Sequence, residues 1–188
     1  MADQNSQTTR TRARILSAAE SLFARQGYQA TTIKQVAEQV GVQGPALYKH
    51  FASKRALYEE VLEQLFAPFT PLLADAATTG ANQPEIMQQH LANPNTSRIV
   101  AQATLSGGED LEMLVERWYR PFFSHTREML DSQTAGLTPV TVMAFHSMLL
   151  GYLTLAPLHE AIFNVDPLTS SALTELLEMQ DRLAGSML

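Results

Sequence analysis

The chain of 188 residues contains no cysteine. Disulfide bonds, thiolate nucleophiles and cysteine-based zinc sites are therefore excluded. The sequence also has neither a basic start followed by an apolar run nor about 18 uninterrupted apolar residues of the kind that span a membrane. We therefore expect a soluble, cytoplasmic protein without a membrane partner.

Signatures of catalysis and of metal binding are missing as well. The spacing of His90, His125, His146 and His159 matches no HExxH-type motif, and no carboxylate accompanies them in a recognisable pattern. No Ser-His-Asp pattern, phosphate loop or supported carboxylate pair occurs. We expect no enzymatic activity, no cofactor and no metal, and we interpret a histidine in this part of the chain as a hydrogen-bond partner for a ligand.

Positive charge is scarce, with 13 Lys and Arg against 19 Asp and Glu and a net charge of -6. The net negative charge is not distributed evenly along the chain, however. Residues 1–65 hold eight basic and six acidic side chains, a net of +2, whereas the remainder holds five and thirteen, a net of -8. A basic excess in the N-terminal part would suit contact with an anionic partner such as a nucleic acid. Because +2 is small, affinity for such a partner would depend on the placement of charge and on doubling by dimerisation.

The clearest motif occupies residues 31–55, TTIKQVAEQVGVQGPALYKHFASKR. Apolar residues at helical spacing predict a short helix that has Thr31 and Thr32 as N-cap candidates and ends at Gly41. Pro45 then opens a second helix reaching Phe51. Two short helices joined by a tight glycine turn form a helix-turn-helix, whose second helix can lie in the DNA major groove. For this segment alone, an ordinary helical hairpin with solvated lysines is the alternative.

The flanking motifs favour the first interpretation. The chain contains I-L-x-A-A-x-x-L-F, G-Y-x-x-T-T-I, V-A-x-x-V-G-V and L-Y-K-H-F-x-S-K-x-x-L. With these motifs, residues 12–62 resemble the DNA-binding domain of the tetracycline-repressor (TetR) family. The resemblance implies an all-α protein with an N-terminal three-helix helix-turn-helix domain, residues 10–55. It also implies a C-terminal helical domain for effector binding and dimerisation, residues 56–188.

The resemblance also indicates which residues contact DNA. Gln can pair with adenine, an Ala methyl can meet the thymine methyl, and Tyr, His and Lys can donate to phosphates. Arginines at the start of the first helix suit phosphates or the minor groove, although a solvated tip is the alternative. The expected contacts are Arg10, Arg12, Thr32, Gln43, Ala46, Tyr48, Lys49, His50 and Lys54.

Three details qualify this expectation. Residues 1–9 are polar and aperiodic, which suggests a disordered arm. The ring of Tyr48 could instead be half-buried in the core. Many family members carry a Ser, a Lys or Arg, a Gly and a Thr or Ser where this chain has Gln43-Gly44-Pro45-Ala46, so few side chains remain to read bases and DNA shape gains importance.

Downstream, helical periodicity and breakers predict further helices but no strands. We expect kinks at Pro68 and Pro71 and a bend at Pro121. The expected helices run from Ser53 to about Pro68, from Pro84 to His90, from Asn93 to Leu105, from Glu109 to Asp131, from Thr138 to Pro157 and from Leu168 to Leu183.

By resemblance, apolar side chains in this half could line a cavity for a small apolar or amphipathic effector, although each could simply be core. The candidates are Met87, Trp118, Phe122, Met129, Phe145, His146, Met148 and Tyr152. The last two long helices would form a two-fold dimer. Its expected interface is drawn from Val142, Phe145, Leu149, Leu173, Leu176, Leu177 and Met179.

The sequence thus predicts a homodimeric transcriptional repressor that binds a palindromic double-stranded operator and is released by a small molecule. A regulator without a small-molecule effector is the alternative within DNA binding. A helical small-molecule-binding protein or enzyme with a vestigial DNA domain is the alternative from another class.

Overall fold

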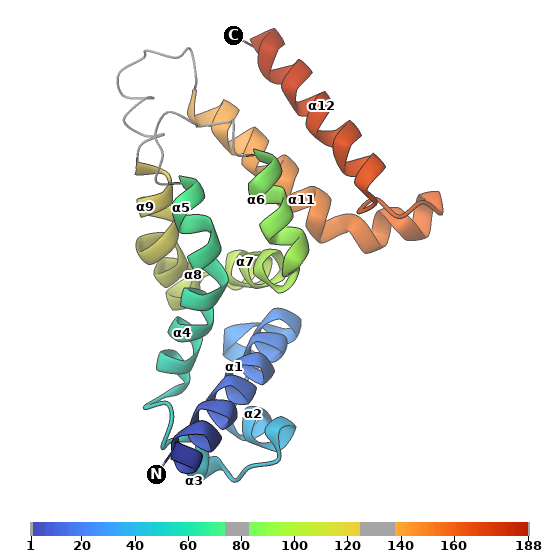
Figure 1. The fold of residues 1–188 in the computed structure, drawn as a ribbon. Coiled ribbons are helices and arrows are strands. Elements are labelled where there is room, and N and C mark those ends of the chain that lie inside the picture. The colour runs from blue at the N-terminus through green and yellow to red at the C-terminus, as the bar shows by residue number, and fades with distance from the viewer. Residues whose placement is uncertain (1, 74–82, 125–137, 188) are drawn as a thin grey trace. The chain divides into compact units, whose positions relative to one another are not determined.

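The computed structural model describes residues 2–73, 83–124 and 138–187, and within these ranges the regular elements are all helices (Figure 1). The all-α prediction is confirmed. The chain divides into two compact units. We call Met1–Ala67 with Arg98–Leu114 the head, and Pro68–Ser97 with Val115–Leu188 the body. The limits of these units do not coincide with the domain boundary expected between residues 55 and 56.

The head contains α1 (Ala2–Ala30), α2 (Ile33–Val40), α3 (Gly44–Leu47), α4 (Lys54–Phe66), most of α7 (Asn95–Ser106) and α8 (Gly108–Leu114). Residues 2–9 continue α1, so the expectation of a disordered arm is wrong. The segment contains no Gly or Pro to interrupt a helix, and adding a residue to an existing helix avoids the cost of nucleation. Near its other end, α1 departs from helical geometry at Gly27 (φ 79°, ψ 171°).

The core of the head lies where α1 packs against α4 and α2. From α1, Ile15, Ala19 and Phe23 are all fully buried. Phe23 meets Tyr58 of α4 edge to face, with ring centroids 4.8 Å apart and an interplanar angle of 72°. This contact explains why α4 belongs to the same compact unit as the helix-turn-helix.

The ends of α2 are fixed by local hydrogen bonds. Thr32 Oγ1 accepts from the Gln35 N–H at 3.2 Å, and the Thr32 N–H donates to Gln35 Oε1 at 2.8 Å, which completes a capping box. At the other end, Gly41 takes a left-handed conformation (φ 75°) that lets the Val42 N–H donate to the Ala37 carbonyl at 2.9 Å. The predicted helix limits are confirmed at both caps.

The second helix of the motif is shorter than expected. Pro45 opens α3 as predicted, but regular helix ends at Leu47, and hydrogen-bonded turns carry the chain on to Phe51. Both Leu47 and Phe51 are buried, as their spacing predicts. After Phe51 the chain must turn to the cap of α4 at Ser53, which leaves no room for a further helical turn.

The body contains a 3₁₀ turn (Ala67–Phe69, whose first residue closes the head), α5 (Thr70–Leu73), α6 (Gln83–Ala92), a π-helical turn (Val115–Tyr119), α9 (Arg120–Phe122), α11 (Pro139–Phe163) and α12 (Ser170–Met187). The kinks expected at Pro68 and Pro71 are confirmed by the 3₁₀ turn and the short α5.

Two expected helices differ from the structure. The continuous helix expected from Glu109 is divided by the π-helical turn just before Pro121, and residues 125–131 lie outside the described residues. A proline ring clashes with the preceding helical turn, and a wider turn relieves the clash. The helix expected to end near Pro157 continues as α11 to Phe163, and Asn164 (φ 52°) ends it.

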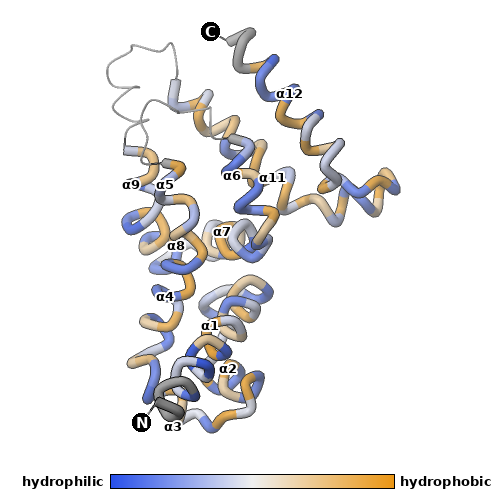
Figure 2. Tube along the Cα trace, viewed as in Figure 1, coloured by the Kyte–Doolittle hydropathy of each residue, from blue (hydrophilic) through white to orange (hydrophobic). Residues whose placement is uncertain are grey.

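The long helix α11 is apolar yet poorly covered. An 18-residue window has a mean hydropathy of 1.4 with 6% of it buried, so by length and composition alone α11 could cross a membrane. Apolar residues, drawn in orange, recur along α11 in Figure 2. Polar residues such as Ser147 and Thr154 interrupt the apolar residues of α11, so the sequence has no uninterrupted apolar run of membrane-spanning length there. Large apolar side chains exposed on this helix are Val140, Met143, Leu155, Leu158, Ile162 and Phe163.

Gly41 and Gly44 form a matched pair for testing the turn of the motif. No atom lies within 4 Å of a methyl group added at either position, but only Gly41 has positive φ. We expect Gly41→Ala to lower the free energy of unfolding by about 1 kcal/mol, because a left-handed conformation costs an L-residue roughly that much. Gly44→Ala should change it by less than about 0.5 kcal/mol. Urea denaturation measures both, and equal losses would contradict this account.

Candidate nucleic-acid interface and ligand site

The side chains expected to contact DNA surround the start of α2, the short α3 and the start of α4. Gln43, Tyr48 and Lys49 are exposed, and Tyr48 keeps 56% of its surface accessible. The alternative of a half-buried Tyr48 ring is therefore wrong. Ala46 and His50 are half-buried. The residues that flank α3 thus leave an amide, a phenol and an ammonium group accessible, and groups of these kinds can contact DNA.

Thr32 is exposed, but its hydroxyl already accepts the capping hydrogen bond of α2. A threonine hydroxyl can accept from the helix and still donate its own hydrogen to a phosphate. Its structural role is therefore compatible with the expected contact.

The arginines at the start of α1 have different surroundings. Arg12 forms an ion pair with Glu60 of α4, and its guanidinium carbon lies 4.9 Å from the centroid of the Phe51 ring. Arg14 Nη2 donates to the Val40 carbonyl at 2.7 Å. Arg10 is exposed. Arg12 and Arg14 hold the helices of the head together, so Arg10 is the strongest candidate of the three for a phosphate contact.

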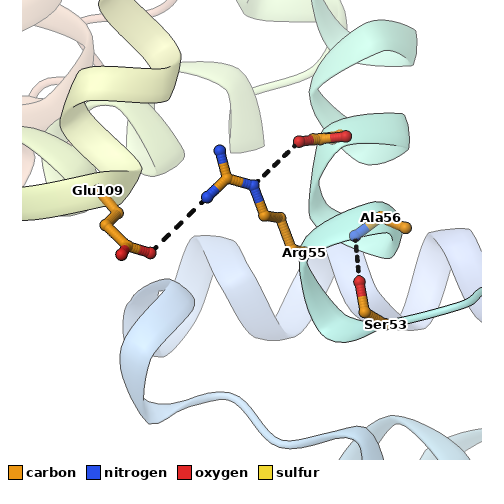
Figure 3. Close-up of polar contacts among 5 residues, drawn as sticks. Ser53, Arg55, Ala56 and Glu109 are labelled. Atoms are coloured by element: carbon orange, nitrogen blue, oxygen red, sulfur yellow. Dashed lines mark hydrogen bonds and ion pairs between the residues drawn. The ribbon is translucent and has the colours of Figure 1, made fainter.

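Lys54 also has a structural role. Its Nζ donates to the Tyr28 carbonyl at 2.8 Å and lies 4.2 Å from the centroid of the Tyr28 ring. Burial lowers the pKa of Lys54, and the negative charge of Asp110 partly opposes this effect. Lys54 begins α4 directly after Ser53, whose Oγ accepts from the Ala56 N–H at 3.0 Å (Figure 3).

Arg55 is a candidate that the sequence analysis missed. It follows Lys54 in the first turn of α4 and is exposed. Figure 3 shows its guanidinium between two carboxylates, with Nε 3.2 Å from Glu59 Oε1 and Nη1 3.7 Å from Glu109 Oε2. Two adjacent cations oppose the dipole at a helix N-terminus, so their placement has no benefit for helix stability. That pattern was readable in the sequence Ser53-Lys54-Arg55.

The described candidates for the ligand site all lie in the body. Met87 and Trp118 are buried, whereas Phe122, Phe145, His146, Met148 and Tyr152 are half-buried. Met129 lies outside the described residues. The Tyr152 hydroxyl donates to the Pro167 carbonyl at 2.7 Å, which ties α11 to the segment before α12 and gives this residue a structural role.

Aromatic rings surround His146. Tyr119 and Phe123 lie edge to face against it, with centroids 5.4 Å and 5.5 Å from its ring. The π-helical turn ends at Tyr119, and π-helical turns are frequent at functional sites. The sequence analysis omitted Tyr119 and Phe123 from the site because regular helical periodicity does not anticipate the extra residue of a π-helical turn.

His90 is a buried histidine of the body that was not among the residues expected in the site. Its Nδ1 lies 2.9 Å from Ser97 Oγ, and its ring centroid lies 4.8 Å from that of Phe69. Burial, helped by the charge that His146 carries when protonated, lowers the pKa of His90 to about 4. Burial also lowers the pKa of His146.

Burial thus favours the neutral form of both imidazoles, and a neutral imidazole offers one donor and one acceptor. Apolar rings with a few neutral hydrogen-bonding groups suit an amphipathic molecule. In the described part of the chain, no three His, Asp or Glu side chains gather in a way that could hold a metal ion.

Comparisons with known proteins identify the head. A family profile described as bacterial regulatory proteins, tetR family, matches residues 15–61. The head therefore carries a DNA-binding domain of the tetR type. The HTH-type transcriptional repressor KstR2 of Rhodococcus jostii is 32% identical over 84 residues, which cover 43% of this chain and 41% of that protein. The match to this curated relative thus spans about two fifths of its length.

Solved structures resemble the chain over most of its length. The transcriptional regulator SCO4942 of Streptomyces coelicolor has a TM-score of 0.66 and 21% identity, covering 92% of this chain and 97% of that one. NalD of Pseudomonas aeruginosa, the secondary repressor of the MexAB-OprM multidrug efflux pump, has a TM-score of 0.61 and 28% identity, covering 93% and 96%. The fold is therefore that of tetR regulators, with an N-terminal helix-turn-helix and a C-terminal helical domain.

Proposed function

We propose that this protein is a transcriptional repressor that binds operator DNA as a homodimer and releases it when a small molecule binds the body. The observation that carries the proposal is the exposure of Gln43, Tyr48 and Lys49, which flank α3, beside the buried Leu47 and Phe51. Its relatives are transcriptional regulators, and both KstR2 and NalD are named as repressors. Such a regulator acts in the cytoplasm, where the DNA is.

The exposed side chains divide by chemistry into base readers and phosphate contacts. Gln43 can pair bidentately with adenine, and Lys49 can donate to guanine. Tyr48, Lys54 and Arg10 have donors suited to phosphates, which carry no sequence information directly. A two-fold dimer would place two such groups about 34–36 Å apart on successive major grooves, so the operator should be a palindrome.

Replacing Gln43 and Tyr48 separately tests this division. The probes are a duplex that the protein selects from a random pool and a random-sequence duplex of equal length. Tyr48→Ala should weaken binding to both by a similar factor, because phosphates are common to all DNA. Gln43→Ala should weaken binding to the selected duplex by ~1–3 kcal/mol and leave the random duplex nearly unaffected.

Arg182→Ala provides the control, because it removes a positive charge from α12 of the body. Fluorescence anisotropy gives the dissociation constants. A wild-type protein that binds neither duplex at low salt would exclude DNA binding. An unchanged preference between duplexes in Gln43→Ala would exclude Gln43 as a base reader.

The dimer is proposed from the uncovered face of α11. At about 100° of rotation per residue, the positions of Val140, Met143, Leu155, Leu158 and Ile162 fall within a sector of roughly 120°. A face this apolar is rarely left exposed on a monomer. Regulators of this family act as dimers, so a second copy of the chain is the occupant that fits. Of the pool expected from sequence, Leu176 is buried and Met179 of α12 is 39% exposed.

Leu158→Glu should dissociate the dimer, because an unpaired carboxylate at a buried interface costs several kcal/mol, on the order of 3–5. The matched control is Leu105→Glu on α7, which is 86% exposed on a different helix. Sedimentation velocity at micromolar concentration should show dimers for wild type and Leu105→Glu and monomers for Leu158→Glu. A monomeric wild type contradicts the proposal, as does protein recovered only with membranes or detergent.

The effector is proposed to bind beside Trp118, Tyr119 and His146. A compound can release DNA only if it binds one state of the dimer better than the other, and such coupling is typically ~1–3 kcal/mol. The residues around His146 are half-buried and aromatic, so an apolar molecule with a hydrogen-bonding group suits them.

Met148 and Met143 provide a matched test on α11, since Met148 is half-buried and Met143 is 64% exposed. Apolar compounds are first screened for release of the selected duplex. Met148→Trp should reduce the affinity of an active compound at least tenfold by filling its space, whereas Met143→Trp should not. In the wild-type protein the compound should change the emission of Trp118, the chain's one tryptophan. Equal affinity in both variants would locate the effector elsewhere.

A further inference from the structure

The start of α8 brings two carboxylates to the cations at the start of α4. Gly107 (φ 64°) and Gly108 (φ 67°) both have left-handed backbone conformations and make a sharp turn between α7 and α8. Glu109 and Asp110 follow at once, in the first turn of α8. Arg98–Leu114 belongs to the same compact unit as the helix-turn-helix, so these carboxylates are part of the head itself.

Glu109 acts on Arg55. The 3.7 Å ion pair joins side chains that are 75% and 53% exposed, so it is loose and accessible to solvent. Exposed pairs of this kind contribute little to stability, about 0–1 kcal/mol. The guanidinium can therefore exchange Glu109 for another anion at small cost.

Asp110 acts from inside the head. Its side chain is 1% exposed, and neither carboxylate oxygen accepts a hydrogen bond among the described residues. Its charge raises the pKa values of Tyr28 and Tyr58, in addition to the larger effect of burial, and it opposes the lowering of the Lys54 pKa. Asp110 directly follows Glu109 in the first turn of α8, and a buried charge without a hydrogen-bond partner interacts more strongly with its surroundings than an exposed one.

The two cations affected lie where a phosphate could bind. Lys54 and Arg55 occupy the first turn of α4, where the helix N-terminus already favours an anion. Lys54 Nζ donates to backbone carbonyls of Tyr28 and Gln29, at 2.8 Å and 3.4 Å. A DNA phosphate arriving at this turn would meet the field of Glu109 and Asp110 as well as that of the cations.

We propose that Glu109 and Asp110 compete with DNA phosphate for Arg55 and Lys54, and so lower the affinity of the head for DNA of any sequence. The inference rests on the proposed function. It adds Arg55 to the phosphate contacts and makes the start of α8 a determinant of affinity. Leu114 ends the head and Val115 begins the π-helical turn of the body, so Glu109 and Asp110 lie six and five positions before the segment that carries Trp118 and Tyr119.

Charge-neutral isosteres test the competition in the full chain. Glu109→Gln and Asp110→Asn should each tighten binding to the selected duplex and to the random duplex by a similar factor, about 3- to 10-fold per dimer. The control is Glu112→Gln, which removes the same charge from an exposed position of α8. It should tighten binding less than twofold.

A double-mutant cycle assigns the effect to its partner. In an Arg55→Gln background, Glu109→Gln should no longer tighten binding, because the cation for which it competes is absent. A persistent gain would show a general effect of net charge and overturn the proposal. The proposal also fails if Glu112→Gln equals the other two variants, or if only the preference between duplexes changes.

The measurements distinguish a failure of the proposed function from a failure of the proposed competition. Binding of the wild-type protein to the selected duplex tests the proposed function, and the ratio of variant to wild-type affinity tests the competition. If Asp110→Asn unfolds, as circular dichroism would reveal, Glu109→Gln decides, because its side chain is 75% exposed and makes no packing contribution comparable to that of Asp110.

Discussion

The packing of α1 against α4 is the contact on which the head depends. Phe23 and Tyr58 are fully buried and meet edge to face, and Tyr28 lies 4.8 Å from the same tyrosine ring. Burying an aromatic side chain stabilises a fold by roughly 1.5–3 kcal/mol, and such ring pairs add to that. Since α4 starts with Lys54 and Arg55, this packing also fixes where the cations are.

Polar contacts around this core also hold α1 and α4 together. Arg12 reaches Glu60 from α1, and Lys54 reaches back to the Tyr28 carbonyl from α4. Side chains that a motif assigns to DNA therefore also hold the helices together. A loss of DNA affinity after removal of Arg12 or Lys54 would mix both effects, whereas Tyr48 and Arg10 are exposed and free of that ambiguity.

Local signals in the sequence predicted much of the head. Thr32, Gly41 and Ser53 mark helix ends through hydrogen bonds and backbone conformations confined to a few residues, and all three are confirmed. Leu47 and Phe51 are buried because their spacing puts them on one side. Signals of this kind need no knowledge of the rest of the fold.

Contacts between distant segments were not predictable in the same way. Nothing in the local sequence of Glu109 indicates that it reaches Arg55, because 54 positions separate them and the contact depends on the turn at Gly107. The π-helical turn adds a residue that regular periodicity does not anticipate, so Tyr119 and Phe123 were missed. His90 was left out for a related reason, since its partner Ser97 comes from the next helix.

The expected effector residues and DNA contacts remain predictions.

The net charge of the chain now has a physical interpretation. Residues 1–65 have an excess of only +2 and cannot form a diffuse basic surface, and the carboxylates of α8 reduce the effective charge at the start of α4 further. Affinity must then come from having two heads on one duplex, since linking two weak sites raises overall affinity without new contacts.

Dimerisation and DNA binding are therefore thermodynamically linked in the proposed mechanism. DNA that binds only the dimer stabilises the dimer by mass action, and dilution that dissociates α11 from its copy weakens binding to the operator. In the proposed mechanism, the exposed face of α11 complements the low charge of the head, because a head that bound DNA tightly alone would not need the second copy.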